Sequence, residues 1–222
     1  MSITNPFFGC FIHPFNKSGD DPWPERLEST SVRIPNTDAC LELLGEVRMP
    51  AHIQDHSRLV CRTALYLTDE LGLAGVALNR SLVVAAALLH DITKPRSFQT
   101  RENHAQTGGE YLSARGFPEV GEIVRQHIVL DDYFAGEDPI EAEVVNYADK
   151  RVLHDRIVPL DDRMNYILER YADTIDMQIL LKQLWKQTAR LEKRLFSFLS
   201  FSPLQLGARL PDMSASDDIC GQ

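Results

Sequence analysis

The sequence predicts an all-α fold built as a single-domain helical bundle. Apolar residues recur at spacings of three and four over most of the chain, which is the period of a helix with one buried face. No stretch alternates apolar and polar residues as a strand would, and no hairpin signal stands out. With 222 residues, the chain is long enough to bury the core of one substantial domain.

Capping and breaking residues divide the periodic pattern into separate helices. Asparagine precedes several apolar stretches, where its side chain can accept a backbone N–H, and Pro95 is expected to end the third helix. The pair Gly108-Gly109 weakens one helix but permits close approach of another backbone. The predicted helices cover about residues 37–48, 50–72, 80–94, 103–116, 118–128, 139–149 and 173–199.

Composition divides the chain into four parts. Residues 1–35 are rich in proline, glycine, asparagine and serine, which predicts an irregular N-terminal arm before the helical domain of residues 36–172. Residues 173–202 predict a long amphipathic C-terminal helix, which either covers the domain or pairs with a second subunit in a homodimer. Residues 203–222 predict a loose tail.

The net charge and the apolar runs exclude several classes of partner. A formal charge of −9 leaves no basic stripe for a phosphate backbone, which argues against general nucleic-acid binding and against anionic membranes. The longest apolar run, 82–89, is too short to span a bilayer, and the N-terminus has no basic region before a hydrophobic one. Four scattered cysteines without a CxxC pair are typical of reduced thiols. We therefore expect a cytoplasmic protein with a small-molecule partner.

Histidine and aspartate recur where the helical pattern calls for apolar residues. A single histidine on such a face is usually a satisfied core residue, and a neighbouring aspartate can simply form a buried ion pair with it. Repetition on five successive helices makes coincidence a poor account, and the cores of helical bundles are where facing helices build metal centres. Imidazole and carboxylate ligands without thiolate suit iron, manganese or zinc, but not copper(I) or iron–sulfur clusters. The candidate metal ligands are His56, His90, Asp91, His104, His127 and Asp149.

Four of these residues carry a family resemblance. His56, the pair His90-Asp91 and Asp149 resemble the H…HD…D signature of the HD-domain metal-dependent phosphohydrolase superfamily, over roughly residues 36–155. The two further histidines resemble the HDIG-like branch whose members hold two metals, which includes bacterial hydrolases of dinucleoside polyphosphates. That branch often has glycine where Thr93 stands here. The resemblance therefore implies an HD-type bundle with a six-ligand binuclear site.

The resemblance also implies a reaction and a cofactor. His56, His90, Asp91 and Asp149 would hold one divalent transition metal and the two remaining histidines a second, with Asp91 bridging. The ions would be iron or manganese in the first place, with zinc, cobalt or nickel as alternatives. A metal-bridging hydroxide would then cleave a phosphomonoester, phosphodiester or phosphoanhydride of a nucleotide or related small molecule.

Three cations near the signature are candidate substrate ligands. Lys94, beside the HD pair, is placed to offset charge on phosphorus or on the leaving oxygen, so Asp91 and Lys94 are the expected catalytic residues. Lys94 also serves as a candidate phosphate ligand, together with Lys150 and Arg151 beside Asp149. The alternative for the last two is a solvated surface charge, and for Lys94 a surface lysine at a helix end.

Two further functions remain open at this point. Some HD-fold proteins use the same six ligands in a mixed-valent di-iron oxygenase, which acts on a small organic substrate with O₂. A module that only binds a ligand is a third possibility. Further along the chain, three arginines are mixed with aspartates, which predicts a salt-bridged surface around a helix break at Pro159; the residues are Arg151, Arg156 and Arg163 with Asp155, Asp161 and Asp162.

Overall fold

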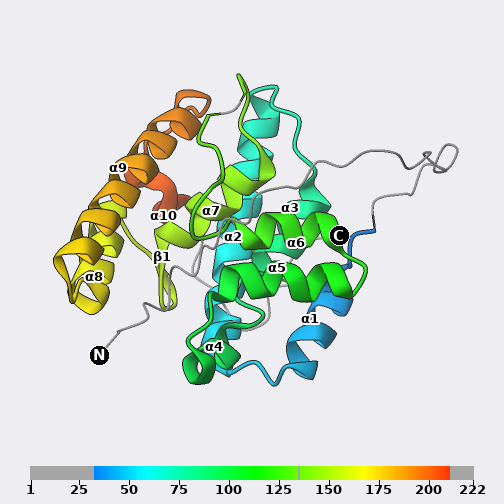
Figure 1. The fold of residues 1–222 in the computed structure, drawn as a ribbon. Helices are drawn as coiled ribbons and strands as arrows, with labels where there is room; N and C mark the ends of the chain where they lie inside the picture. Colours follow the sequence, from blue (N-terminus) through cyan, green and yellow to red (C-terminus); the bar gives the residue numbers. More distant parts are fainter. Residues whose placement is uncertain (1–32, 135, 211–222) are drawn as a thin grey trace, which may run out of the picture.

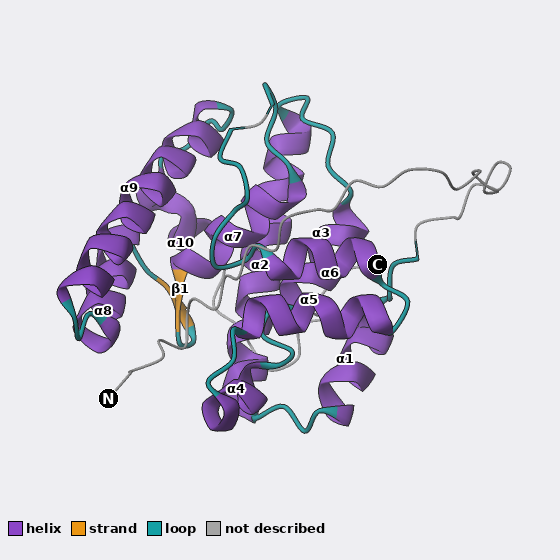
Figure 2. Ribbon diagram, viewed as in Figure 1, coloured by secondary structure: helices purple, strands orange, loops and turns teal. Residues whose placement is uncertain are grey.

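The computed structural model describes residues 33–134 and 136–210, and their regular structure is almost entirely helical (Figure 1; Figure 2). The helices are α1 (Thr37–Glu46), α2 (Ala51–Leu73), α3 (Arg80–Leu89), α4 (Lys94–Thr100), α5 (His104–Ala114), α6 (Pro118–Arg125), α7 (Glu141–Arg151), α8 (Leu160–Tyr171), α9 (Ile175–Ser197), the short 3₁₀ helix η1 (Pro203–Gln205) and α10 (Leu206–Arg209). The predicted all-α class is confirmed. Most of the N-terminal arm predicted over 1–35 lies outside the described residues.

Helix α3 packs against α1, α2, α6 and α7 in the interior of the described fold (Figure 1). Its apolar residues from Val83 to Leu89 are all buried, as expected for a helix that is covered on most sides. The hairpin of α5 and α6 packs against one side of this centre, and the pair of α8 and α9 packs against α7 on the other. The residues that interrupt the apolar surface of α2, α3 and α7 therefore meet in the interior.

Two glycines set the distance between α5 and α6. A Cβ atom at Gly109 would lie 2.7 Å from the carbonyl oxygen of Gly121, and a Cβ atom at Gly121 would lie 2.5 Å from that of Gly109. Neither contact is tolerable, because real Cβ atoms do not approach backbone this closely. The close backbone approach predicted for the glycine pair is thus confirmed at Gly109, and it fixes how the hairpin presents the start of α5.

Asparagine caps three helices where the sequence predicts them. The side chains of Asn36, Asn79 and Asn103 each accept a backbone N–H from the first turn of α1, α3 and α5, respectively. The predicted role of Pro95 is wrong, because α3 already ends at Leu89 and Pro95 lies in the first turn of α4. A proline there loses no hydrogen bond, since the first backbone N–H groups of a helix have no partner within it.

Short elements occupy the segment that follows α7. Strands β1 (Val152–Leu153) and β2 (Arg156–Ile157) form an antiparallel pair in which Val152 lies opposite Ile157. The sequence predicts no strand here, because two residues are too few to show an alternating pattern. His154 in the turn has a φ of 58°, and Pro159 then directly precedes α8, a helix that the sequence analysis did not predict.

The C-terminal helix is present as α9, which packs against α7 and α8. The predicted loose tail is wrong for its first residues, because η1 and α10 follow α9 and Leu206 is fully buried. Burial of Leu206 therefore contributes to holding this short segment on the domain. The remainder of that predicted tail lies outside the described residues. No helix within the described ranges is long and apolar enough to cross a membrane.

Candidate metal centre

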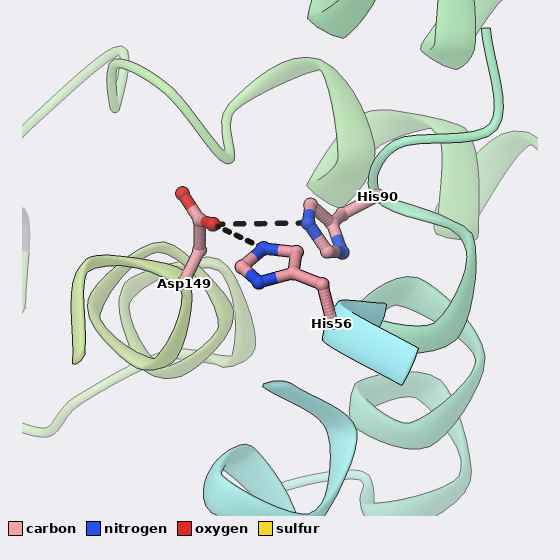
Figure 3. A group of neighbouring side chains, drawn as sticks. All are labelled: His56, His90 and Asp149. Carbon is pink, nitrogen blue, oxygen red and sulfur yellow. Dashed lines mark hydrogen bonds and ion pairs between the residues drawn. The ribbon is translucent and has the colours of Figure 1, made fainter. Parts of the chain in front are cut away.

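Three of the predicted ligands meet where the central helices face one another. His56 comes from α2, His90 directly follows the last residue of α3, and Asp149 comes from α7 (Figure 3). Oδ1 of Asp149 lies 3.2 Å from Nε2 of His56 and 3.7 Å from Nε2 of His90. We call these three residues the first group. Their ligand atoms lie within 4.8 Å of one another, so the group could hold a metal ion.

The other three predicted ligands form a second group. Asp91 follows His90, His104 begins α5, and His127 lies just beyond the end of α6. Oδ1 of Asp91 lies 3.1 Å from Nε2 of His104 and 3.7 Å from Nε2 of His127. These ligand atoms also lie within 4.8 Å of one another, so this group too could hold a metal ion.

Asp91 joins the two groups. While its Oδ1 faces the second group, its Oδ2 lies 3.4 Å from Nε2 of His90 in the first group. The rings of His90 and His127 stand edge to face, with their centroids 5.0 Å apart. The structure therefore brings all six predicted residues into one cluster, with a single carboxylate between its halves.

Backbone carbonyls fix the orientation of three of the rings. Nδ1 of His90 donates to the carbonyl of Ala87, and Nδ1 of His127 donates in the same way to Val124, at 2.8 and 2.7 Å. Nδ1 of His56 donates to the carbonyl of His154, in the β1–β2 turn, at 3.3 Å. A neutral ring that donates through Nδ1 can offer its Nε2 to a metal ion, and each of these Nε2 atoms lies close to a carboxylate, with that of His56 hydrogen-bonded to Oδ1 of Asp149.

Such an arrangement requires positive charge between the groups. Nε2 of His90 and Oδ1 of Asp91 are buried atoms without a hydrogen bond in the described part of the chain. Facing acceptors repel each other unless a proton or a cation lies between them, and buried polar atoms are rarely left unsatisfied. A divalent ion satisfies both conditions, and carbonyl-oriented imidazoles beside carboxylates are a usual donor set for one. The residues present thus fit a metal centre.

The pKa values of these side chains shift in opposite directions. Burial lowers the pKa of His90, but Asp91 and Asp149 outweigh it, so this pKa lies above its ordinary value. Burial and the neighbouring imidazoles lower the pKa of His127 well below its ordinary value. Burial raises the pKa of Asp91, yet Lys94 and His90 hold it well below the ordinary range. In the metal-free protein, the carboxylates therefore favour the protonated form of His90, burial favours the neutral form of His127, and Asp91 favours its charged form.

Lys94 lies directly at the cluster. Its Nζ is 2.7 Å from Oδ2 of Asp91, and its side chain is 30% exposed whereas that of Asp91 is 1% exposed. Burial lowers the pKa of Lys94, but Asp91 outweighs this effect and the pKa is raised. The lysine therefore brings a permanent positive charge to the solvent-facing side of the buried carboxylate.

Lys150 and Arg151 do not act together as the sequence suggested. Lys150 is buried, and its Nζ donates to Oδ2 of Asp149 at 2.9 Å and to the carbonyl of His127 at 2.8 Å. It therefore holds the Asp149 carboxylate in position. Both contacts direct the Lys150 ammonium into the protein and away from solvent.

Arg151 does not lie at the cluster, contrary to its predicted role as a phosphate ligand. Its guanidinium is buried and donates to the carbonyls of Val158 and Pro203, and it also binds the hydroxyl of Tyr147 and the carboxylate of Glu192. These partners lie in the turn before α8, on α7, on α9 and at η1. Arg151 thus ties the C-terminal segment to the domain and does not reach the histidine cluster. Adjacent helix positions point in different directions, so the neighbouring Lys150 reaches Asp149 whereas Arg151 does not.

Two supporting contacts were not predicted from the sequence. The hydroxyl of Thr93 donates to the carbonyl of His104 at 2.8 Å and lies 2.9 Å from the hydroxyl of Thr107, so it anchors the start of α5. Thr93 has a negative φ of −103°, so its position does not need glycine. The carbonyl that orients His56 belongs to His154. A backbone acceptor leaves no signal in the sequence, since any residue type supplies it.

Comparison with known families finds the HD domain. Its family model matches residues 53–152, the segment that contains both groups. Among curated proteins, the chain is 29% identical over 147 residues to the tRNA (cytidine(56)-2'-O)-methyltransferase of Picrophilus torridus, which covers 60% of this chain and 40% of that protein. It is 34% identical over 110 residues to the dihydroneopterin 2',3'-cyclic phosphate phosphodiesterase of Methanocaldococcus jannaschii, which covers 43% of this chain and 44% of that protein.

The chain thus spans less than half the length of these curated relatives. Among solved structures, it is similar to a predicted HD superfamily hydrolase from an uncultured Thermotogales bacterium, with 21% identity, a TM-score of 0.42, and coverage of 74% of this chain and 94% of that one. The family match and the geometry concern the same segment, which supplies every residue of the first and second groups. Residues 53–152 therefore match the HD-domain family model and carry all six candidate ligands.

Proposed function

We propose that this protein is a metal-dependent phosphohydrolase that cleaves a phosphodiester or phosphoanhydride bond of a nucleotide or related small molecule. The observation that carries the proposal is the junction of two metal-competent groups at one buried carboxylate, Asp91. A pair of adjacent cation sites suits a phosphoryl group, because both the attacking and the leaving oxygen need positive charge nearby.

In this proposal, the two groups hold two divalent ions, as in the HDIG-like branch. His56, His90 and Asp149 would hold one ion, His104 and His127 would hold the other, and both would share Asp91. Bound divalent ions would act as Lewis acids on the phosphoryl group and would make water a better nucleophile near neutral pH.

The chain's own residues prepare the site for this chemistry. The carbonyls of Ala87 and Val124 hold two rings with Nε2 directed at the carboxylates, which spares the site any reorganisation when an ion binds. Lys150 holds Asp149 in its ionised form from the buried side. Lys94 approaches Asp91 from the solvent side, where its ammonium can stabilise negative charge on the phosphoryl or leaving oxygen.

The preference for a diester follows from a curated relative. The protein of Methanocaldococcus jannaschii is named as a phosphodiesterase of a 2',3'-cyclic phosphate, and its similarity to this chain extends over 110 residues. A diester carries one negative charge, and the small number of cations at the cluster is compatible with such a substrate. We therefore propose small cyclic or linear phosphodiesters as the first substrates to test.

The decisive experiment compares hydrolysis with oxygen consumption. Purified protein loaded with Mn²⁺ or Fe²⁺ is incubated with bis(p-nitrophenyl) phosphate and with a panel of cyclic and linear nucleotides, and an oxygen electrode follows the iron-loaded sample in parallel. We expect product release that a chelator abolishes and added metal restores, without oxygen uptake. Oxygen consumption with no phosphoester cleavage would contradict the proposal and would favour the di-iron oxygenase.

A further inference from the structure

Helix α8 lies outside the segment that matches the HD domain, yet it packs against the helix that carries Asp149. Figure 1 shows α8 and α9 as a pair on one side of the molecule. The sequence predicted a salt-bridged surface here, with Arg163 among several aspartates. The structure departs from that prediction at Arg163 itself.

Arg163 has no ionic partner in the part of the chain that the structure describes. Asp161 and Asp162 occupy the same first turn of α8, but neither forms an ion pair with it. The Nε of Arg163 is buried without a hydrogen bond, and the side chain as a whole is half-buried. A guanidinium has five donors, so leaving them without protein acceptors is costly unless a ligand or water takes them.

A chain of contacts leads from Arg163 to the first group. The Arg163 guanidinium carbon lies 5.8 Å from the ring centroid of Tyr166, and that ring stands edge to face with the ring of His154 at 5.4 Å. The backbone carbonyl of His154 in turn accepts from Nδ1 of His56. Arg163 is therefore linked to His56 through two ring contacts and one hydrogen bond, and its contact with Tyr166 leaves Nε without an acceptor.

The charge of Arg163 acts on both sides of the cluster. The pKa of Asp149 is held well below its ordinary value despite burial, mainly by Lys150, and Arg163 contributes to this lowering. Burial and Arg163 both act to lower the pKa of Lys94, against the stronger effect of Asp91. One guanidinium that influences α7 and α4 alike lies within electrostatic range of both ends of the site.

We propose that Arg163 is a substrate-binding residue that donates hydrogen bonds to the non-bridging phosphoryl oxygens of a phosphoester held at the two groups. Lys94 and Arg163 then approach the same anion from α4 and α8, respectively. A planar guanidinium is the side chain best suited to bind phosphate through two parallel hydrogen bonds. This inference rests on the proposed function for the identity of the ligand, but not for the presence of an anion site.

The test measures binding of inorganic phosphate to the metal-loaded protein by calorimetry. Wild type is compared with Arg163→Gln, Arg163→Lys and the control Arg170→Gln, which changes an exposed arginine in the last turn of the same helix. We expect the dissociation constant to rise about 10- to 100-fold in Arg163→Gln, less in Arg163→Lys, and not at all in Arg170→Gln. Metal content and thermal midpoint are measured for each variant, and we expect both to stay at wild-type values.

Steady-state kinetics with bis(p-nitrophenyl) phosphate separate binding from structural effects. We expect Arg163→Gln to raise KM by a factor similar to that for phosphate and to change kcat less. Equal phosphate affinity in wild type and Arg163→Gln overturns the inference even if the wild type is an active hydrolase. A loss of affinity that occurs only together with loss of metal or of folded protein also overturns it. Weaker phosphate binding by a folded, metal-loaded Arg163→Gln supports the anion site, even if no phosphoester is cleaved.

Discussion

The two groups of histidine and aspartate differ in how firmly the fold holds them. In the first group, both rings donate through Nδ1 to a backbone carbonyl, and Asp149 is fixed by Lys150. In the second group, His127 is held in the same way, but no such bond is found for His104 in the described structure. Six candidate ligands of similar chemistry therefore form two sites that the fold holds unequally. We expect the first group to bind its ion more tightly.

The difference has a structural origin. The first group is built on α2, α3 and α7, which pack directly against one another in the core. The second group depends on His104, which the α5–α6 hairpin presents from the side and which Thr93 holds only through the backbone carbonyl. A ligand whose ring is free to turn loses more conformational entropy when it binds a metal.

Asp91 belongs to the second group and also contacts His90 of the first, so replacing it should have the largest effect. Asp91→Asn removes the charge that faces His90 and the second group alike. We expect loss of both ions and a fall in turnover of about a thousandfold. Elemental analysis and a diesterase assay measure the two effects. The matched control Asp55→Asn, at an exposed position on α2, should retain metal and activity; two ions in Asp91→Asn would disprove the bridging role.

Single histidine variants test whether the groups are separate sites. His56→Gln should lose the tightly bound ion, whereas His104→Gln should retain it and lose only the weaker one, and each should lower turnover by about a hundredfold. Metal titrations followed by elemental analysis measure the stoichiometry. His52→Gln, one turn before His56 and exposed, is the control and should bind both ions. If both variants lose the same ion, the division into two groups is wrong.

Lys94→Met separates turnover from metal binding. Its ammonium is 2.7 Å from Oδ2 of Asp91 and competes with a cation for that oxygen. We therefore expect Lys94→Met to retain both ions while kcat falls about a hundredfold, because charge on the phosphoryl or leaving oxygen is no longer offset. Lys94→Arg, which retains the charge, should recover part of the rate. An unchanged kcat in Lys94→Met would show that the lysine has no catalytic role.

The pH dependence of metal binding should differ between the groups. The pKa of His90 is raised, so its protonated form stabilises the metal-free protein below pH 6.5, and this contribution is lost as the pH rises through the folded-state pKa. An ion entering the first group must displace that proton, so its affinity should rise by up to about tenfold per pH unit below this pKa. The pKa of His127 is already lowered, so the second group should depend less on pH. Calorimetric titrations at pH 6, 7 and 8 measure both affinities.

The clustering of the six candidate ligands could be predicted because each of them breaks an apolar pattern. His56 and Asp149 occupy positions where the helical period calls for an apolar side chain, and both lie in the core. Helix caps such as Asn103 were predictable for a similar reason, since they act within a few residues of the chain. Local chemistry and periodicity were therefore sufficient for the class of the fold and for the candidate ligands.

The roles of the long cationic side chains could not be predicted in this way. Arg151 and Lys150 are adjacent, and yet one binds the C-terminal segment while the other holds Asp149. Arg163 resembles a surface residue in the sequence. In the described part of the chain, however, it has no ionic partner, and ring contacts connect it to His154 next to the metal-competent cluster. Helix α8 was itself missed, since the prolines and mixed charges around it hide a short amphipathic pattern.

The sequence by itself determined that the protein is helical and which imidazoles and carboxylates enter its core, because burial selects residue types and helical periodicity records that selection. Only the tertiary structure decided how those candidate ligands divide between two groups, how Asp91 joins them, and which arginines are left with a buried Nε that has no hydrogen bond among the described residues. The physical reason is that a flexible cationic side chain takes the partners that distant elements bring within its reach, and those partners depend on how the helices pack.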